Sequence, residues 1–313
     1  MNKVCISSMS ALEMADQMIK LGQAEILVVG GQESMTNAPY FVDKARRGYR
    51  MGDGVLKDGM IYDGLWDAFE DMHMGKGADA WARRYGITRE QMDFIGALSQ
   101  QRAAEATEQG RLAEEIMPVE VPQKKGDPQV FDKDEGVRPE TTVEALAKLK
   151  PAFDKEGAVT AGNASQINDG ACAAVVMSAD RAREMGLEPL FKVISYGWNA
   201  GEFADLHPCP ALSIMNALDR TELQVGDLKL LEINEAFASV TWRSTELLGL
   251  DPKTMDKVNV NGGAIAFGHP IGVSGIRIVT TLAYELRRRG GGYGAAGICG
   301  GGGQGDGMVI EAG

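Results

Sequence analysis

The chain has 313 residues, 44% of them hydrophobic and 24% charged, which fits a globular protein with more than one core. Its net charge of −12 argues against general affinity for nucleic acid or an anionic membrane, and no stretch approaches the ~20 apolar residues of a membrane span. The 4 cysteines lack CxxC spacing and only 3 histidines accompany them, so we expect no zinc site and a reducing compartment.

The first predicted elements are a helix over residues 9–20 and a buried strand over residues 26–29, which ends at two glycines. The apolar residues of the helix recur at helical spacing: Met9, Leu12, Ala15 and Ile19. Cys5 is therefore expected at a helix N-terminus, where the dipole and free N–H groups can lower a thiol pKa below ~8.5. A single cysteine is more often buried and inert, so both interpretations stay open.

Residues 36–165 differ in composition and pattern, with many glycines, methionines and charged residues and few strand-like runs. A helix is predicted from about Thr88 to Gly110, because Thr88 and Gln91 have capping-box spacing. Residues 121–139 indicate a polar loop or hairpin. We interpret this block as an insertion.

From about residue 191 the sequence alternates between strand and helix patterns, which is typical of a layered α/β fold. Strands are predicted over residues 228–233 and 258–260, helices over residues 235–248 and 273–289, and a hairpin from the apolar runs 294–299 and 308–310.

Three residues in this part are chemical candidates. His269 lies in a glycine-rich loop, and Pro270 after it restricts its backbone so that the imidazole would point out of the loop. Cys299 precedes a run of glycines that no helix follows, so an exposed thiol is favoured over a phosphate-binding loop, with a packed cysteine in a tight hairpin as the alternative. Asn234 ends a strand and is either a helix N-cap or a catalytic residue.

Several short motifs, in order, resemble the thiolase family from the first residues to the last. They are CISS (5–8), GGQESMTNAPY (30–40), HMG (73–75), TAGNASQINDGA (160–171), NEAFA (234–238), GGAIAFGHPIGVSG (262–275) and ICGGGGQG (298–305).

The resemblance implies a layered αβαβα fold with two similar halves and a loop domain inserted in the first. On that pattern, residues 1–36 and 166–187 belong to the N-terminal half, residues 37–165 form the inserted loop domain, and residues 188–313 form the C-terminal half. Thiolases carry core strands before the nucleophile, and here only residues 1–4 precede it. We therefore expect a first half that is N-terminally incomplete.

The resemblance also implies roles for five residues. Cys5 would attack an acyl-CoA to give an acyl-enzyme, and His269 would take its proton. Cys299 would remove or return the α-proton of the second acetyl-CoA. Asn234 would hold a water that forms one oxyanion hole with His269, and the N–H groups of Cys5 and Gly301 would form the other.

Substrate binding is expected to involve His73, Met74, Ser165 and Ala236, with acyl-CoA and CoA as partners, no nucleic acid, no membrane and no cofactor. Weaker candidates for the CoA phosphates are Arg83, Arg84, Lys124 and Lys125. The HMG motif resembles the short-chain type, so we expect acetyl-CoA acetyltransferase activity, in the cytoplasm, from a homodimer or homotetramer.

One departure from the family pattern is Ser8, where thiolases have glycine; its side chain either narrows the pocket or is tolerated. Three other functions remain as alternatives. They are a broader-chain 3-ketoacyl-CoA thiolase, a non-catalytic thiolase-like fragment, and a Cys-His hydrolase that would leave Cys299 and Asn234 without a role.

Overall fold

The computed structural model describes all of residues 1–313. The helices are α1 (Ser7–Lys20), α2 (Met74–Arg84), α3 (Arg89–Glu108), α4 (Val143–Leu146), α5 (Ala179–Glu184), α6 (Cys209–Leu218), α7 (Ala238–Leu247), α8 (Ala264–Phe267) and α9 (Ser274–Arg288). The strands are β1 (Ile26–Glu33), β2 (Tyr40–Val42), β3 (Leu56–Asp58), β4 (Trp66–Asp67), β5 (Met72–His73), β6 (Val119–Val121), β7 (Gln129–Phe131), β8 (Gly170–Met177), β9 (Lys192–Ala200), β10 (Leu230–Ile233), β11 (Gly292–Gly300) and β12 (Gln304–Ala312). None of these helices combines the length and apolar character needed to cross a bilayer.

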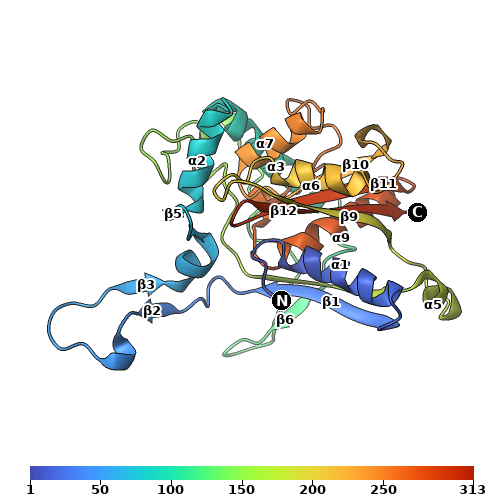
Figure 1. Cartoon of the computed structure of the whole chain (residues 1–313), viewed down its shortest axis with the longest axis horizontal. Coiled ribbons are helices and arrows are strands. Elements are labelled where there is room, and N and C mark those ends of the chain that lie inside the picture. The colour runs from blue at the N-terminus through green and yellow to red at the C-terminus, as the bar shows by residue number, and fades with distance from the viewer.

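The elements stack in layers, as the α/β pattern predicts. In Figure 1, α6 lies above a central sheet, α1 and α9 lie below it, and β1 lies below those helices. The central sheet has the strand order β10-β11-β12-β9, with β10 parallel to β11 and the other neighbours antiparallel. The predicted hairpin near the C-terminus is therefore confirmed as β11 and β12.

Both faces of the central sheet are buried. Ala295 and Val309 pack into one apolar cluster with α6 and α7, while Ile298 and Ile310 pack into a second cluster with α1 and α9. A sheet covered on both faces needs strands that are apolar throughout rather than alternating. This explains the uninterrupted apolar runs in the last part of the sequence.

Glycines bring α6 directly onto the sheet. A Cβ at Gly197 would lie 2.4 Å from the backbone N of Ala217, and one at Gly307 would lie 2.5 Å from the carbonyl carbon of Ser213. Only residues without a side chain allow the two backbones to approach so closely. Part of the glycine content thus serves packing.

A smaller sheet pairs β1 with β8 in antiparallel register, from Ile26 opposite Met177 to Glu33 opposite Gly170. The predicted strand over residues 26–29 is confirmed and continues to Glu33. Leu27 and Val29 pack with α1 and α9, whereas Val28 and Val175 are exposed on the outer face.

Between β10 and α8 one predicted strand was wrong, and one predicted helix is confirmed with a later start. Residues 258–260 form only isolated bridges, from Val258 to Leu231 and from Val260 to Gly262, because Asn259 adopts a φ of 49°. Its side chain instead bonds the N–H and the carbonyl of Ile233, both at 2.8 Å, and so replaces a strand ladder. The helix predicted from residue 235 begins at Ala238, with Phe237 in the N-cap position.

The middle block agrees better with its sequence pattern. Thr88 and Gln91 form the predicted capping box at the start of α3, and the polar segment near residue 121 is a hairpin of β6 and β7. A second hairpin, β2 and β3, projects as an arm from the body (Figure 1).

Candidate active site

Cys5 lies two residues before the start of α1, next to the N-cap residue Ile6, and is half-buried. Burial raises the pKa of the Cys5 thiol to about 12, and the nearby backbone N–H groups of Gly301 and of Cys5 itself offset only part of this rise. The predicted position at a helix N-terminus is confirmed, whereas the predicted fall in pKa was wrong because burial outweighs the N–H groups.

Cys299 lies in β11 and is 1% exposed, so the expected exposed thiol was wrong and the alternative of a packed cysteine holds. The sheet buries it because β11 is covered on both faces. Burial raises the pKa of Cys299 well above its usual value, and the neighbouring thiols of Cys5 and Cys209 act in the same direction. The two thiols, Cys5 and Cys299, are thus close enough for the charge of one to affect the pKa of the other.

His269 is also buried, and its imidazole points out of its loop toward Asn234. Its Nδ1 lies 2.5 Å from Oγ of Ser274, and its Nε2 lies 3.4 Å from Nδ2 of Asn234. Burial, and secondly the charge of Arg277, lower the pKa of His269 to about 4. The imidazole is therefore neutral near pH 7 and able to accept a proton.

Asn234 is fully buried between β10 and the site. Its N–H donates to the carbonyl of Gly297 in β11 at 3.0 Å, and Oδ1 has no hydrogen-bond partner within the chain. Because α7 starts only at Ala238, Asn234 is not the N-cap that one interpretation predicted. The open Oδ1 is able to bind a small polar molecule.

The two helices that carry the site meet at their N-termini. Oγ of Ser8, in α1, donates to the carbonyl of Val273 and accepts from the N–H of Ile276, both at 3.0 Å. The serine is thus tolerated because its hydroxyl bonds the start of α9. Ser274, at that same start, holds His269, so the cysteine and histidine segments are fixed to each other through Ser8 and Ser274.

Ser274 and Glu235 were not identified from the sequence. The buried carboxylate of Glu235 accepts from Oγ of Ser99 at 2.6 Å and from the N–H of Ile265 and Nδ2 of Asn259, both at 3.0 Å. It therefore holds α3, the segment after β10 and the loop before His269 together. Two signals were available: a hydroxyl five residues after His269 at a helix start, and a carboxylate next to Asn234.

The predicted substrate-binding residues form two groups. The N–H of Ser165 donates to the carbonyl of Ala236 at 3.1 Å. His73 caps α2, its Nδ1 accepting from the N–H of Gly75 at 3.0 Å, and burial lowers its pKa. Met74 follows, and a Cβ at Gly301 would lie only 3.4 Å from its Cε. Met74 therefore lines the space next to Gly301 and Cys5.

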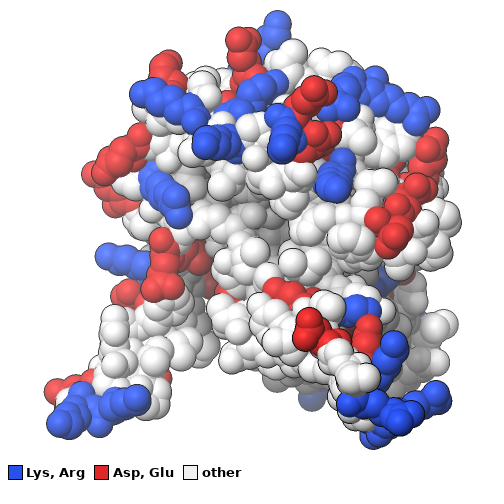
Figure 2. All heavy atoms as spheres, turned by 90° about the vertical axis from the view of Figure 1, so that its left-hand side faces the viewer, with Lys and Arg blue, Asp and Glu red and all other residues white.

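The left-hand side of Figure 1 is hollowed at its centre, with basic side chains along the upper rim (Figure 2). Of the predicted phosphate-binding candidates, Arg83 and Arg84 form exposed ion pairs with Asp154 and Glu202, both at 3.7 Å. Exposed ion pairs of this length contribute little to stability, so both arginines can exchange these carboxylates for another anion. Lys124 and Lys125 lie in the exposed turn between β6 and β7.

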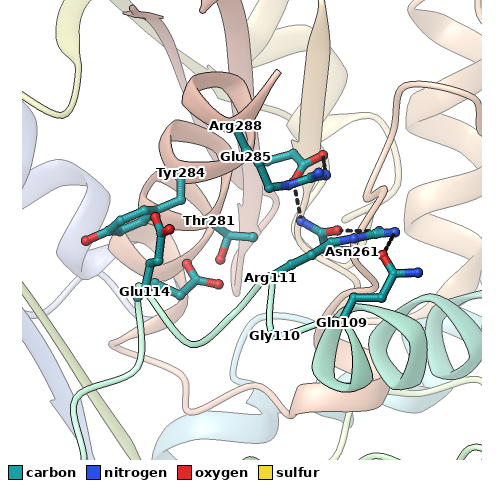
Figure 3. Close-up of a pocket in the computed structure, with 10 residues that line it drawn as sticks. Gln109, Gly110, Arg111, Glu114, Asn261, Thr281, Tyr284, Glu285 and Arg288 are labelled. Carbon is teal, nitrogen blue, oxygen red and sulfur yellow. Dashed lines mark hydrogen bonds and ion pairs between the residues drawn. The ribbon is translucent and has the colours of Figure 1, made fainter. Parts of the chain in front are cut away.

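A separate cavity of about 270 Å³ lies between the end of α3 and α9 (Figure 3). It contains none of the predicted site residues. Most of its charges already pair: Arg288 donates to Glu285 and Arg111 to Asn261. Burial raises the pKa of Glu115, on the other wall, to about 7. The candidate chemistry is thus not in this cavity.

Comparison with known proteins agrees with the motifs. A family model described as thiolase, N-terminal domain, matches residues 1–180, and one described as thiolase, C-terminal domain, matches residues 187–312. A probable acetyl-CoA acetyltransferase of Mycolicibacterium smegmatis is 49% identical over 99% of this chain and 79% of its own length. The acetyl-CoA acetyltransferase of Pseudomonas aeruginosa is 50% identical over 99% of this chain and 78% of its own.

Two solved structures are similar over 100% of the chain and 78% of their own, each with a TM-score of 0.95 and 39% identity. They are a human mitochondrial 3-ketoacyl-CoA thiolase and a Bacillus anthracis acetyl-CoA acetyltransferase.

Proposed function

The chain belongs to the thiolase family, and on that premise we propose that it transfers acetyl groups between Cys5 and coenzyme A. The reaction is the condensation of two acetyl-CoA to acetoacetyl-CoA, or the reverse thiolysis. The observation that carries the proposal is that the Cys5 turn packs on the glycine run that follows Cys299: a Cβ at Gly300 would lie 3.4 Å from Cδ1 of Ile6, and one at Gly301 would lie 3.7 Å from Cγ1 of Val4. Relatives named acetyl-CoA acetyltransferase support the same substrate.

The first step is acylation of Cys5. A thiol with a pKa raised to about 12 is protonated near pH 7, so it needs a base. Burial keeps His269 neutral near pH 7, and it accepts the proton as the carbon–sulfur bond forms, so that no free thiolate is needed. The sulfur attacks the acetyl carbonyl and CoA leaves as its thiol, taking that proton. The N–H groups of Cys5 and Gly301 stabilise the oxyanion, an effect worth roughly 3–4 kcal/mol per donor.

The second step forms the carbon–carbon bond. Cys299, as the thiolate, removes a proton from the α-carbon of a second acetyl-CoA; its raised pKa makes that thiolate a strong base. The enolate oxygen is met by His269 and by a water on Asn234, whose Oδ1 is free of protein partners. The carbanion attacks acetyl-Cys5, the acyl–sulfur bond breaks and acetoacetyl-CoA is released. The departing Cys5 thiolate takes the α-proton from Cys299, which returns Cys5 to the thiol and Cys299 to the thiolate.

The acyl chain is expected to be short, because Met74 occupies the space next to Gly301. The second candidate is a broader-chain 3-ketoacyl-CoA thiolase, which the similarity to the human mitochondrial enzyme favours. Thiolysis rates on acetoacetyl-CoA and on 3-ketopalmitoyl-CoA decide between them. A higher kcat/KM on the long chain would overturn the short-chain assignment.

Acetylation itself is tested by intact mass after incubation with acetyl-CoA, followed by peptide mapping. We expect one acetyl group, on Cys5. A folded protein that never acetylates there supports a non-catalytic thiolase-like fragment. Hydrolysis of simple esters without transfer to CoA would instead support a Cys-His hydrolase.

We further propose a homodimer or homotetramer in the cytoplasm that uses no cofactor. The β2–β3 arm supports association, because it exposes Tyr40, Leu56 and Val55 away from the body. All 4 cysteines are free thiols, which fits a reducing compartment. Light scattering of the purified chain tests the oligomer: a monomer at micromolar concentration would contradict it.

A further inference from the structure

The turn that presents Cys5 is strained. Val4 has a φ of 52°, in the left-handed region that β-branched residues avoid. Its N–H donates to Oδ1 of Asn2 at 3.0 Å, and its carbonyl accepts from Oγ of Ser7 at 2.6 Å. Such a conformation persists only where surrounding contacts determine it. The local bonds are partly exposed, so a stronger anchor is needed.

A buried carboxylate on the central sheet supplies that anchor. Asp306, in β12, is 2% exposed, and its Oδ1 and Oδ2 accept from Nζ of Lys3 at 2.8 Å and 3.1 Å. Oδ2 also accepts from Oγ of Ser10. Lys3 precedes the turn and Ser10 follows it, so one carboxylate fixes both of its ends. Bonds between ionised partners are among the stronger ones available to a side chain.

We propose that Asp306 is a positioning residue that aims Cys5 at the N–H of Gly301; this rests on the proposed role of Cys5 as nucleophile. The strand pairing makes the link direct. Asp306 lies opposite Ile298, and Gly305 lies opposite Cys299 in the same hairpin. The hairpin that carries Cys299 and leads into Gly301 thus also carries the anchor for the Cys5 turn.

The geometry explains why a carboxylate suits this position. Three bonds converge on two oxygens, from an ammonium and a hydroxyl that come from opposite sides of the turn. An amide of the same size offers one acceptor oxygen, and its NH₂ group would face the Lys3 ammonium. Asp306→Asn therefore removes the anchor without changing the volume of the side chain.

The test compares Asp306→Asn, Lys3→Met and the double variant of the full chain by the rate of Cys5 acetylation with acetyl-CoA, measured by quench and intact mass. Each single change is expected to slow acetylation roughly tenfold to hundredfold, since small displacements of a reacting group have effects of this size. The double variant should be no slower than the slower single variant, because both changes break one contact. Lys3→Arg should restore acetylation.

Glu13→Gln is the matched control. Glu13 is also buried between α1 and the central sheet, where it accepts from Nε1 of Trp198 at 2.7 Å, but it does not bond the turn. Its acetylation rate should stay within about twofold of the parent, as for a contact outside the reacting geometry. Equal melting temperatures across the set separate positioning from stability. If Asp306→Asn does not fold, Ser10→Ala removes one of the same bonds more gently.

Alkylation of Cys5 by iodoacetamide distinguishes failure of this inference from failure of the proposed function. If the parent chain never acetylates, the proposed function fails, and slower alkylation in Asp306→Asn still supports positioning. If the parent acetylates and Asp306→Asn acetylates at the same rate, the inference is overturned. It is also overturned if the double variant is slowed by the product of the Asp306→Asn and Lys3→Met effects.

Discussion

Nδ1 of His269 and Oγ of Ser274 lie 2.5 Å apart, both buried, at the point where the histidine loop joins α9. The bond fixes the ring, so that Nε2 faces Asn234. Orientation of an imidazole through its second nitrogen is a general way of selecting its tautomer. With Nδ1 bonded to Ser274, Nε2 is the ring nitrogen that faces Asn234 and exchanges protons in the site.

Ser274→Ala should lower kcat for thiolysis roughly tenfold to hundredfold, because the ring loses its fixed orientation. The melting temperature should fall by only a few degrees, since one buried hydrogen bond is lost and no charge is left unpaired. Ser195→Ala, which removes a hydroxyl buried under α6 and bonded to the carbonyl of Ala217, serves as the control with near-normal kcat. An unchanged kcat in Ser274→Ala would contradict the orienting role.

Cys5→Ala should abolish acetyl-enzyme formation entirely, because no other thiol is held at the N–H of Gly301. Intact mass after acetyl-CoA treatment measures this. Cys172→Ala is the control: that thiol faces Thr280, away from the site, and its loss should leave labelling intact. Residual stoichiometric acetylation of Cys5→Ala would show that another residue is the nucleophile.

Cys299→Ala should still acetylate on Cys5 but lose condensation, with kcat falling by about 10² or more, as for removal of a general base. Acetylation by mass and acetoacetyl-CoA formation by absorbance report the two steps separately. Normal condensation in this variant would make the assignment of the base wrong.

Met74→Ala should widen the space beside Gly301 and shift chain-length preference. The ratio of kcat/KM for 3-ketohexanoyl-CoA to that for acetoacetyl-CoA is expected to rise roughly tenfold, the scale of a few methylene contacts. Met185→Ala, an exposed methionine that follows α5, is the control and should leave the ratio unchanged. A constant ratio in Met74→Ala would place the length limit elsewhere.

The pKa of His269, lowered from 6.5 to about 4, makes stability depend on pH. Between these values the unfolded chain binds the proton and the folded chain does not, so the free energy of unfolding falls as pH drops from 6.5 to 4 and is unaffected above 6.5. The loss attributable to His269 is about 3 kcal/mol. In urea titrations, His269→Gln should remove this part of the decline in the free energy of unfolding. If the free energy of unfolding depends on pH equally in the parent and the variant, His269 is not the cause.

Much of the fold was predictable because its signals are local. The capping box of Thr88 and the apolar runs of β11 and β12 depend on neighbouring residues alone. The start of α7 was not, since Phe237 is held extended by a bridge to Ala164, far away in sequence. The strand predicted near Asn259 is missing for a similar, long-range reason. The Asn259 side chain, not a neighbouring strand, bonds the backbone of Ile233.

The candidate site divides in the same way. The motifs identified which residues to consider, and the structure brings Cys5 to Gly301 and His269 to Asn234. The pKa of Cys5 could not be predicted from its position before a helix. It depends on how deeply the thiol is buried, and the β11–β12 turn that covers the thiol is distant in sequence. The division into halves and a loop domain, and the catalytic roles, stay predictions.

The pairing of β1 with β8 has a consequence for how the chain folds. Residues 26–33 must find residues 170–177 while everything between them is still forming, and closing a loop of that length has an entropic cost that local contacts do not offset early. By contrast, α9, β11 and β12 are consecutive and can assemble at once. We therefore expect refolding in two phases. The amides of the β11–β12 hairpin become protected from hydrogen exchange first, and α1 packs against the sheet only when the loop between β1 and β8 closes.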